Sequence, residues 1–433
     1  MSLDSLKSIL KEQYDLFVSK DLGTEREILK TLSKPIKSPH VLVITGLRRV
    51  GKSTLLAQIA KKYLAQKFYY INFEDERLLN FTTKDFDSLH ETLISIFGER
   101  KIFLFDEIQN VPEWERFVRR LYDQGYKFMI TGSNASLLSQ ELGTRLTGRH
   151  LKIELFPFSF REYLNFYNVK IPKLDILTTT QRGKLLKYQS DYMLSGGIPD
   201  ALKYPDINLH KTLYDDVLYR DIATRYRLNN TKELKELAFY LISNISSLIS
   251  FNKLKELLML GSTNTVKSYI DYLETSWLFF TLNKYAYSVK EQQIASKKIY
   301  TIDTGLAKSI GFSFSNNLGG LIENIVYLNL RQNQKNLYYY KTADNYEVDF
   351  YSPNENLFIQ VSYYLDKINI DREIRALVKA NIEKDSSNIK NRLIIITENL
   401  KNTITVGDKK ITILPLYEWL LKKNQVGRGD TMN

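Results

Sequence analysis

The sequence contains no cysteine, and only 4 of its 433 residues are histidine. Without thiols the chain cannot form disulfides, thiolate zinc sites or a cysteine nucleophile, and the few histidines show no spacing typical of metal ligands. No run of about 18 or more apolar residues occurs, which argues against a membrane-spanning helix. Residues 1–7 include no long apolar segment of the kind that directs export. We therefore expect a cytoplasmic protein without a membrane partner.

Basic residues outnumber acidic ones, with 61 Lys and Arg against 49 Asp and Glu and a net charge of +12. A basic surface attracts DNA and other polyanions. Because no long block of lysine or arginine occurs, the excess charge is equally consistent with solubility alone. The length predicts two or three domains, and an apolar content of 43 % is enough for a sizeable core.

A glycine-bearing loop at residues 46–53 stands between the apolar run 41–44 and an apolar helical stretch. Its spacing fits the phosphate-binding P-loop, G-x-x-x-x-G-K-[ST]. The glycines allow close approach of the backbone, and the loop amides and the helix start face phosphate. Lys52 would supply charge to the β- and γ-phosphate oxygens and Ser53 a hydroxyl to Mg²⁺. The predicted nucleotide-binding residues are Gly46, Leu47, Arg48, Arg49, Val50, Gly51, Lys52, Ser53 and Thr54.

Two carboxylates, Asp106 and Glu107, follow the apolar run 102–105. Asp106 would hold Mg²⁺ together with Ser53, and Glu107 would orient or deprotonate the attacking water. An acidic pair alone also serves as a helix start. Here the pair lies about 50 residues after Lys52, with a whole strand between, so the two motifs support each other.

Two further catalytic positions are predicted with alternatives. The strand 127–131 runs into Ser133 and Asn134, and we select Asn134 as the residue that senses or positions the water. It is equally suited to cap the helix that follows. Arg149, ahead of Arg145, is predicted as an arginine finger that acts on the γ-phosphate of a neighbouring subunit in a homo-oligomer. The alternative is a surface arginine, or one paired with Glu141.

Read in order, the motifs resemble prokaryotic and archaeal ATPases of the AAA+ superfamily, in the branch with an uncharacterised C-terminal region. The resemblance implies ATP as the nucleotide, and no guanine-reading Asn-Lys-x-Asp motif is visible. It allows roles in DNA transactions, defence or stress signalling without choosing among them. The motifs are Gly46–Ser53, Phe103–Glu107, Thr131–Ser133, Gly148-Arg149, Pro157–Tyr163, Gly196–Pro199, Tyr219–Ile222, Lys298–Leu306 and Glu347–Phe350.

The middle of the chain has the pattern of a winged helix-turn-helix, with helices near 231–245, 251–258 and 265–277 and two β-prone runs, 278–287 and 298–302. DNA contact would place Asn264 and Lys267 outward. Against it, Asp271 and Glu274 on the same face leave a net charge of −1, and phosphate neutralisation supplies much of the affinity for DNA. The alternative is a packing or interdomain role. Lysines of the wing that favour DNA are Lys284, Lys290, Lys297 and Lys298.

Beyond residue 311, a helix, three strands, a helix and a strand give the layout of a PD-(D/E)xK nuclease-like core. Glu323 and Asp349 fit the first two metal-ligand positions of that chemistry. Gln360 stands at the third carboxylate position and Ser362 at the lysine position, and neither can replace the charge. We therefore predict no cleavage, although Lys367 could reach in from elsewhere.

The predicted fold class is α/β, with a five-stranded parallel P-loop sheet. Its domains are an AAA+-like ATPase domain at 1–200 with a helical lead-in, a winged-helix domain at 201–310, an inactive nuclease-like domain at 311–423 and a disordered tail at 424–433. The predicted function is Mg²⁺-dependent ATP hydrolysis coupled to DNA or to a partner protein. One alternative is a nucleotide-gated switch with negligible turnover, which Glu107 argues against. The other is a DNA-processing nuclease, which Gln360 and Ser362 argue against.

Overall fold

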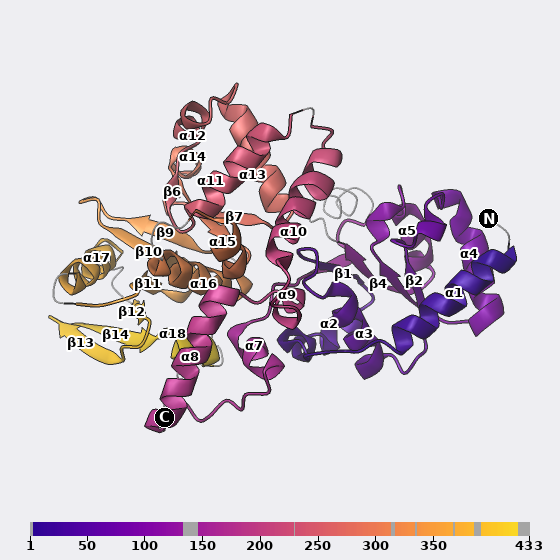
Figure 1. Cartoon of the computed structure of the whole chain (residues 1–433), viewed down its shortest axis with the longest axis horizontal. Coiled ribbons are helices and arrows are strands. Elements are labelled where there is room, and N and C mark those ends of the chain that lie inside the picture. The colour runs from indigo at the N-terminus through magenta and orange to yellow at the C-terminus, as the bar shows by residue number, and fades with distance from the viewer. Residues whose placement is uncertain are drawn as a thin grey trace. The chain divides into compact units, whose positions relative to one another are not determined.

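The structure is a computed structural model and describes residues 3–132, 146–228, 230–312, 317–333, 336–366, 369–384 and 391–422. The chain forms two compact units, Met1–Phe156 with Thr275–Trp277, and Pro157–Glu274 with Leu278–Asn433 (Figure 1). None of the helices in the described ranges is long and apolar enough to cross a membrane.

The first unit is built on a five-stranded parallel sheet, as predicted, and its strand order is β2-β3-β4-β1-β5. Strands β1 to β4 are almost entirely buried and mostly apolar, as expected for a parallel sheet covered on both faces, whereas in the edge strand β5 only Ile153 is buried. Because parallel strands all end at the same edge, the loops after β1, β3 and β4 are neighbours. The strands are β1 Val41–Thr45, β2 Tyr69–Asn72, β3 Ile102–Asp106, β4 Lys127–Gly132 and β5 His150–Glu154.

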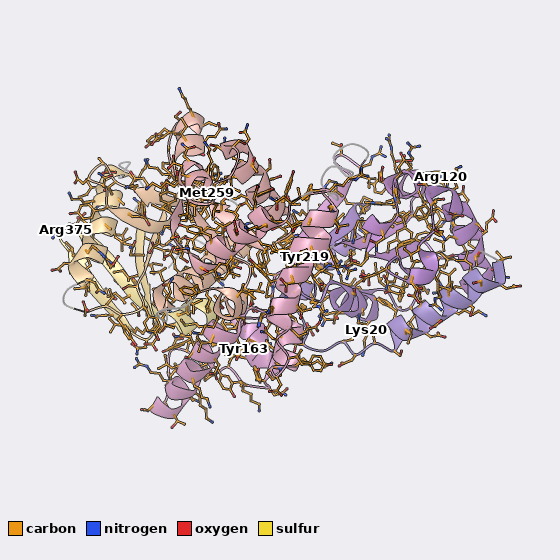
Figure 2. All side chains as sticks on the ribbon, turned by 45° about the horizontal axis from the view of Figure 1, so that its top comes forward. Lys20, Arg120, Tyr163, Tyr219, Met259 and Arg375 are labelled. Carbon is orange, nitrogen blue, oxygen red and sulfur yellow. The ribbon has the colours of Figure 1, made fainter. Side chains whose placement is uncertain are left out.

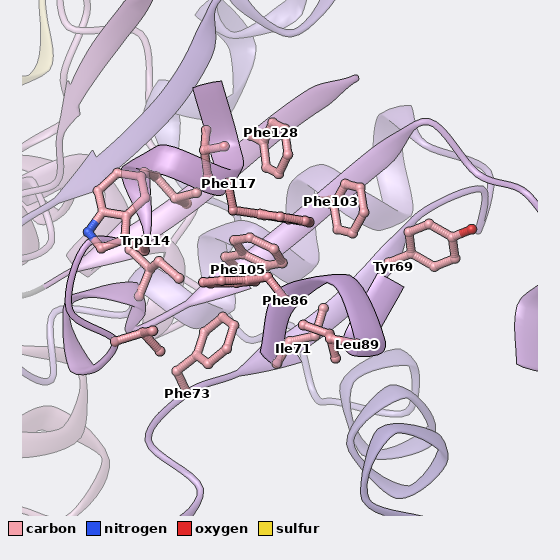
Figure 3. Packing of buried hydrophobic residues seen from close by; sticks show 14 of the residues in the cluster. Tyr69, Ile71, Phe73, Phe86, Leu89, Phe103, Phe105, Trp114, Phe117 and Phe128 are labelled. Carbon is pink, nitrogen blue, oxygen red and sulfur yellow. The ribbon is translucent and has the colours of Figure 1, made fainter. Parts of the chain in front are cut away.

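Aromatic side chains fill the core on one face of this sheet (Figure 3). The rings of Phe86 and Phe117 stack at 4.5 Å, and those of Phe103 and Phe128 at 5.0 Å. Each buried phenylalanine contributes roughly 1.5–3 kcal/mol. The core therefore fixes the strands that carry the predicted site. The helices of this unit are α1 Leu3–Val18, η1 Glu27–Thr31, α2 Ser33–Lys37, α3 Lys52–Tyr63, η2 Glu76–Leu78, η3 Thr83–Asp85, α4 Phe86–Phe97, η4 Ile108–Asn110 and α5 Glu115–Asp123.

The second unit begins with helices and a small antiparallel sheet of order β6-β8-β7. Its helices before the sheet are α7 Phe160–Phe166, α8 Thr179–Ser195, α9 Pro199–Lys203, α10 Leu209–Asp216, the π-helix Val217–Thr224 and α11 Lys232–Ser243. The elements that follow are β6 Leu248–Ile249, α12 Phe251–Leu257, α13 Thr263–Thr275, β7 Phe279–Leu282, α14 Val289–Ile294, β8 Lys297–Thr301 and α15 Thr304–Ile310. The predicted order of three helices and two β-prone runs is found, with β6 and α14 added.

The rest of this unit is a sheet with the strand order β13-β14-β12-β11-β10-β9. Strands β9, β10 and β11 are antiparallel, whereas β12 runs parallel to β11 and β14. The predicted helix, three strands, helix and strand are found, followed by elements that were not predicted. The elements are α16 Leu318–Asn333, β9 Tyr338–Lys341, β10 Glu347–Ser352, η6 Pro353–Glu355, β11 Leu357–Val361, α17 Ile370–Glu383, β12 Arg392–Thr397, β13 Asn402–Val406, β14 Lys409–Pro415 and α18 Leu416–Leu421. The predicted tail 424–433 lies outside the described residues.

Two of the quoted motifs form one structural contact in the second unit. The Asp303 carboxylate accepts from Leu306 N at 3.2 Å, which caps α15, and from Gly197 N at 2.6 Å. Gly196 has a φ of +72°, and a Cβ there would overlap the Asp303 carboxylate. The Gly-Gly motif and the Asp303 motif therefore hold the end of α8 against the start of α15, which is a structural role.

Candidate active site

The loop between β1 and α3 has a backbone that depends on its glycines. Gly51, the residue before α3, has a φ of +94°, which a residue with a Cβ adopts only with strain. A Cβ on Gly46 would overlap the Leu155 carbonyl oxygen. Leu47 and Val50 are fully buried, so only their backbone can face a ligand.

The ammonium of Lys52 is buried beneath this loop, with the residue only 5 % exposed. Its Nζ donates to the carbonyl oxygens of Gly46 and Leu47, both at 3.3 Å. The same nitrogen lies 3.6 Å from Glu107 Oε1. Glu107 thus balances the charge of Lys52, and two weak carbonyl bonds hold the ammonium where phosphate oxygens could replace them.

Asp106 lies at the end of β3 and is almost fully buried. It accepts hydrogen bonds from the hydroxyls of Thr131 and of Tyr70, the latter at 3.2 Å, and the Ser53 hydroxyl is also within hydrogen-bond reach. Burial raises the pKa of Asp106, and the hydrogen bonds from Thr131 and Ser53 work in the opposite direction. Ser53 and Asp106 thus converge as oxygen donors, the type that Mg²⁺ prefers.

Glu107 follows immediately, in a left-handed backbone conformation with a φ of +51°. Its N–H donates to Thr131 Oγ1 at 3.0 Å, and its Oε2 accepts from Gln109 Nε2 at 2.5 Å. The single hydroxyl of Thr131 therefore bridges the carboxylate of Asp106 and the backbone of Glu107. This arrangement fixes the candidate metal ligand relative to the candidate base.

Sequence reasoning missed four residues that support the site. Thr131 could have been found, because a polar residue at the end of a buried parallel strand points to the edge where the other loops meet. Tyr70 and Gln109 are unremarkable in their sequence context. Arg26, which is 5 % exposed, donates to Val50 O at 2.9 Å and to Phe156 O at 2.5 Å. Arg26 thus connects the segment before β1 to the P-loop, and no local sequence pattern predicts this role.

The remaining predicted nucleotide-binding residues lie in the loop or directly after it. Arg48 lies 3.7 Å from Glu74 Oε1, Arg49 is exposed with a φ of +60°, and Thr54 lies in the first turn of α3. Ser133, Asn134 and Arg145 lie outside the described residues.

Arg149 lies at the amino-terminal ends of the strands, whereas the site lies at their carboxyl ends. It precedes β5, and its guanidinium pairs with Asp123 Oδ1 at 2.8 Å. The site follows the other ends of the strands, roughly 15 Å away at about 3.3 Å per residue. The structure therefore brings together Lys52, Ser53, Asp106 and Glu107, and does not bring Arg149 to them within one chain.

Two charges assigned to the surface of the middle region are drawn inward: Lys298 is fully buried, so its predicted exposure was wrong, and Glu274 is half-buried. Glu274 accepts from Thr281 N at 2.7 Å and Thr281 Oγ1 at 2.8 Å, because β7 returns past the end of α13; burial raises the pKa of this carboxyl. Lys298 is 1 % exposed, because β8 is the central strand of its sheet and is buried on both faces from Lys298 onward. The exposed charges of α13 are then Lys267 and Asp271, which cancel.

These features define the class of the first unit: a P-loop domain, with the phosphate loop after β1 and the acidic pair after β3. Residues 38–164 match the family model of the AAA domain, and residues 186–316 match a domain of unknown function. The first unit therefore has an AAA+-type P-loop ATPase fold.

The chain is 38 % identical over 396 residues to an uncharacterized protein of Methanocaldococcus jannaschii, with 88 % of each chain covered, and it belongs to the same family. An uncharacterized protein of Haemophilus influenzae is 29 % identical over 423 residues, which are 94 % of this chain and 100 % of that protein. The solved structure of AMPPCP-bound DnaA from Aquifex aeolicus is 16 % identical, covering 57 % of this chain and 86 % of that chain at a TM-score of 0.24. We draw no inference from a TM-score this low.

Proposed function

We propose that the protein hydrolyses ATP with Mg²⁺. The observation that carries this proposal is the convergence of Lys52, Ser53, Asp106 and Glu107 at the ends of β1 and β3. Ser53 and Asp106 would hold Mg²⁺, which supplies charge stabilisation at the phosphates. Lys52 would exchange its bonds to Gly46 and Leu47 for bonds to phosphate oxygens.

Glu107 is assigned as the general base. In the structure its carboxylate lies beside Lys52 and accepts from Gln109. When Lys52 turns to phosphate, Glu107 loses its counter-charge and becomes the stronger acceptor for a proton from water. A protein that only binds nucleotide needs no such carboxylate, which favours turnover over the switch alternative.

The test is steady-state ATP turnover by the full chain and by Glu107→Gln. The amide keeps the shape but cannot accept the proton, so kcat is expected to fall by roughly 10²- to 10⁴-fold while ATP affinity is kept. Glu91→Gln, on the exposed face of α4, is the matched control and is expected to turn over normally. Negligible turnover by the unmodified chain would support the switch alternative, whereas measurable turnover with an unchanged kcat in Glu107→Gln would refute the assignment of Glu107 as the base.

A neighbouring subunit is part of this proposal, because Arg149 lies far from the site of its own chain. Arg149 would leave Asp123 and reach the γ-phosphate across a homo-oligomer. Asn134 would position the water, and Arg145 is the alternative finger. Arg149→Ala is expected to lower kcat without changing ATP affinity, and activity should rise more steeply than in proportion to protein concentration. Strictly proportional activity over the whole concentration range contradicts the finger.

We further propose that the region 231–302 is a winged helix that couples ATP turnover to DNA. The order α11-β6-α12-α13-β7-α14-β8, with β8 between β6 and β7 in the sheet, supports this assignment. The turn between α12 and α13 carries Met259, which is 92 % exposed (Figure 2). The Glu274 carboxylate is half-buried and bonded to Thr281, and the two fully exposed charges of α13, Lys267 and Asp271, cancel. Exposed candidates for DNA contact are Lys253, Asn264, Lys267, Ser268 and Lys290.

ATP turnover with duplex or single-stranded DNA across a salt series tests this coupling. Stimulation that falls with salt supports it, because phosphate contacts release counterions. The pair Asn264→Ala/Lys267→Ala is expected to weaken DNA binding and reduce the salt slope by about 1. Unchanged binding and slope would contradict the winged-helix contact, and no stimulation at any salt would point to a protein partner.

The C-terminal core is proposed to be nuclease-like and inactive. Gln360 accepts from Asp349 N at 3.2 Å and donates to Glu373 Oε2 at 2.6 Å, so its amide is a satisfied core group. Ser362 donates to the Tyr364 carbonyl, and Lys367 lies outside the described residues. DNA cleavage with Mg²⁺ or Mn²⁺ that Asp349→Ala abolishes would contradict inactivity.

A further inference from the structure

The ammonium of Lys298 lies among three carboxylates in the second unit. Lys298 Nζ is 2.7 Å from Asp349 Oδ1, 2.9 Å from Glu347 Oε1 and 3.0 Å from Glu323 Oε1. The lysine comes from β8 of the three-stranded sheet, whereas the carboxylates come from α16 and β10. Its side chain is only 2 % exposed, so this cation is sealed from solvent.

The carboxylates are also held by uncharged donors. Asp349 Oδ2 accepts from Val361 N at 2.8 Å, and Glu323 Oε1 accepts from the Tyr300 hydroxyl at 2.7 Å. Tyr300 is fully buried. Asp349 and Glu323 are therefore held by further hydrogen bonds, Glu347 completes the set from a partly exposed position, and the lysine is the cation that joins all three.

This cluster includes Glu323 and Asp349, the two positions at which the nuclease-like layout would place metal ligands. In the described part of the chain, no three potential ligands stand close enough together to hold a metal ion. Oxygens surround Nζ at 2.7–3.0 Å, whereas Ca²⁺ takes oxygens at about 2.3–2.6 Å and Mg²⁺ at about 2.0–2.1 Å. The carboxylates would therefore have to move inward to hold a divalent metal in place of the ammonium.

The electrostatics agree with a permanent ammonium. Burial works against the charged form of Lys298, but Asp349, Glu323 and Glu347 outweigh it and raise the lysine pKa well above its usual value. A buried ammonium that is paired and fully hydrogen-bonded is retained, whereas an unpaired one is not tolerated.

We propose that Lys298 is a built-in cation that occupies the place of a divalent metal among Glu323, Glu347 and Asp349 and closes this core to metal-dependent chemistry. The inference does not depend on ATP hydrolysis, because every residue in it belongs to the second unit. Lys298 is then a cause of inactivity in addition to Gln360 and Ser362, and one substitution removes it. Hard oxygen ligands would then favour Mg²⁺, Ca²⁺ or Mn²⁺.

The test is Mn²⁺ binding by the full chain, followed by electron paramagnetic resonance, in an Asp106→Asn background that removes the metal ligand of the P-loop. With Lys298 present we expect no Mn²⁺ at the cluster. Lys298→Met keeps the length of the side chain and removes its charge. This variant is expected to bind one additional Mn²⁺, at least tenfold more tightly than the cluster binds Mn²⁺ when Lys298 is present. Asp349→Asn should abolish this gain, and the control Lys290→Met, at an exposed position, should show none.

A folded Lys298→Met chain that takes up no Mn²⁺ overturns the proposal. A Lys298→Met chain that folds only with Mn²⁺ supports it, because the metal then replaces the missing charge. If this variant is unfolded with and without Mn²⁺, Mn²⁺ binding by the chain that keeps Lys298 is the test instead. Mn²⁺ uptake that Asp349→Asn abolishes would overturn the proposal, and absence of uptake would support it.

Discussion

Replacing Thr131 by valine tests the reasoning about the active site most directly. The Thr131 hydroxyl donates to the Asp106 carboxylate and accepts from Glu107 N at 3.0 Å, and it is completely buried. Valine has nearly the same shape, so the change removes the hydroxyl and leaves the packing. The Glu107 N–H then has no partner in the described structure, and Asp106 loses a bond that lowers its pKa.

The magnitude follows from these two bonds. A hydrogen bond to a charged group contributes about 1.5–3 kcal/mol, which corresponds to a factor of roughly 10 to 150. Groups that orient a metal ligand usually change affinity or activity by about 10- to 100-fold. We therefore expect Thr131→Val to need about 10- to 100-fold more Mg²⁺ for half-maximal ATP turnover. Because the pKa of Asp106 rises further without the hydroxyl, the acid limb of the pH profile should move to higher pH.

The assay is ATP turnover as a function of Mg²⁺ at several pH values, with urea unfolding measured in parallel. Thr131→Ser is the matched control, since it keeps the hydroxyl and loses one methyl group, and its Mg²⁺ requirement should stay within about threefold of the original. A Thr131→Val chain with unchanged Mg²⁺ requirement and unchanged kcat would refute the bridging role of Thr131. A loss of folding in both variants would assign the effect to packing.

Three further predictions follow from contacts in the two units. Gly46→Ala places a Cβ against the carbonyl oxygen of Leu155, the residue after β5, so the loop must shift. ATP affinity in a fluorescent-nucleotide titration should fall at least about tenfold, and unchanged affinity would contradict this contact. Gly196→Ala, which meets Asp303, should lower the free energy of unfolding in urea by roughly 1–3 kcal/mol, whereas Gly183→Ala, in open space on α8, should raise it by roughly 0.5–1 kcal/mol. Burial lowers the pKa of His90. As pH falls below about 6.5, the unfolded chain therefore binds a proton before the folded chain does, and the free energy of unfolding decreases. His90→Phe should remove this decrease in denaturation curves at pH 5–7, and an unchanged pH dependence would contradict the role of His90.

The P-loop and the acidic pair were predictable because their chemistry depends on short spacings along the chain. Lys52 and Ser53 are adjacent, as are Asp106 and Glu107, and each pair follows an apolar strand. Parallel strands end at one edge of a sheet, so the convergence of these residues follows from the strand pattern alone. Thr131 belongs to the same edge, but its role depends on which oxygen its hydroxyl meets, and that requires coordinates.

Charges near the ends of elements were predicted less well. Periodicity gave the correct helix for Glu274 but not the return of β7, which partly buries its carboxylate. Lys298 was assigned to a wing surface because a lysine is usually exposed, yet its partners are 25 to 51 residues away along the chain. No local rule can anticipate a partner at that separation.

The sequence by itself determined the five-stranded parallel sheet, the P-loop with its acidic pair and the order of most helices and strands after residue 231, because each rests on periodicity or on fixed spacing. Only the tertiary structure decided that Arg149 lies away from its own site, that Thr131 joins Asp106 to Glu107 and that a lysine lies among the carboxylates of the C-terminal core. These facts depend on strand direction, hydroxyl orientation and burial, which arise when distant segments pack together.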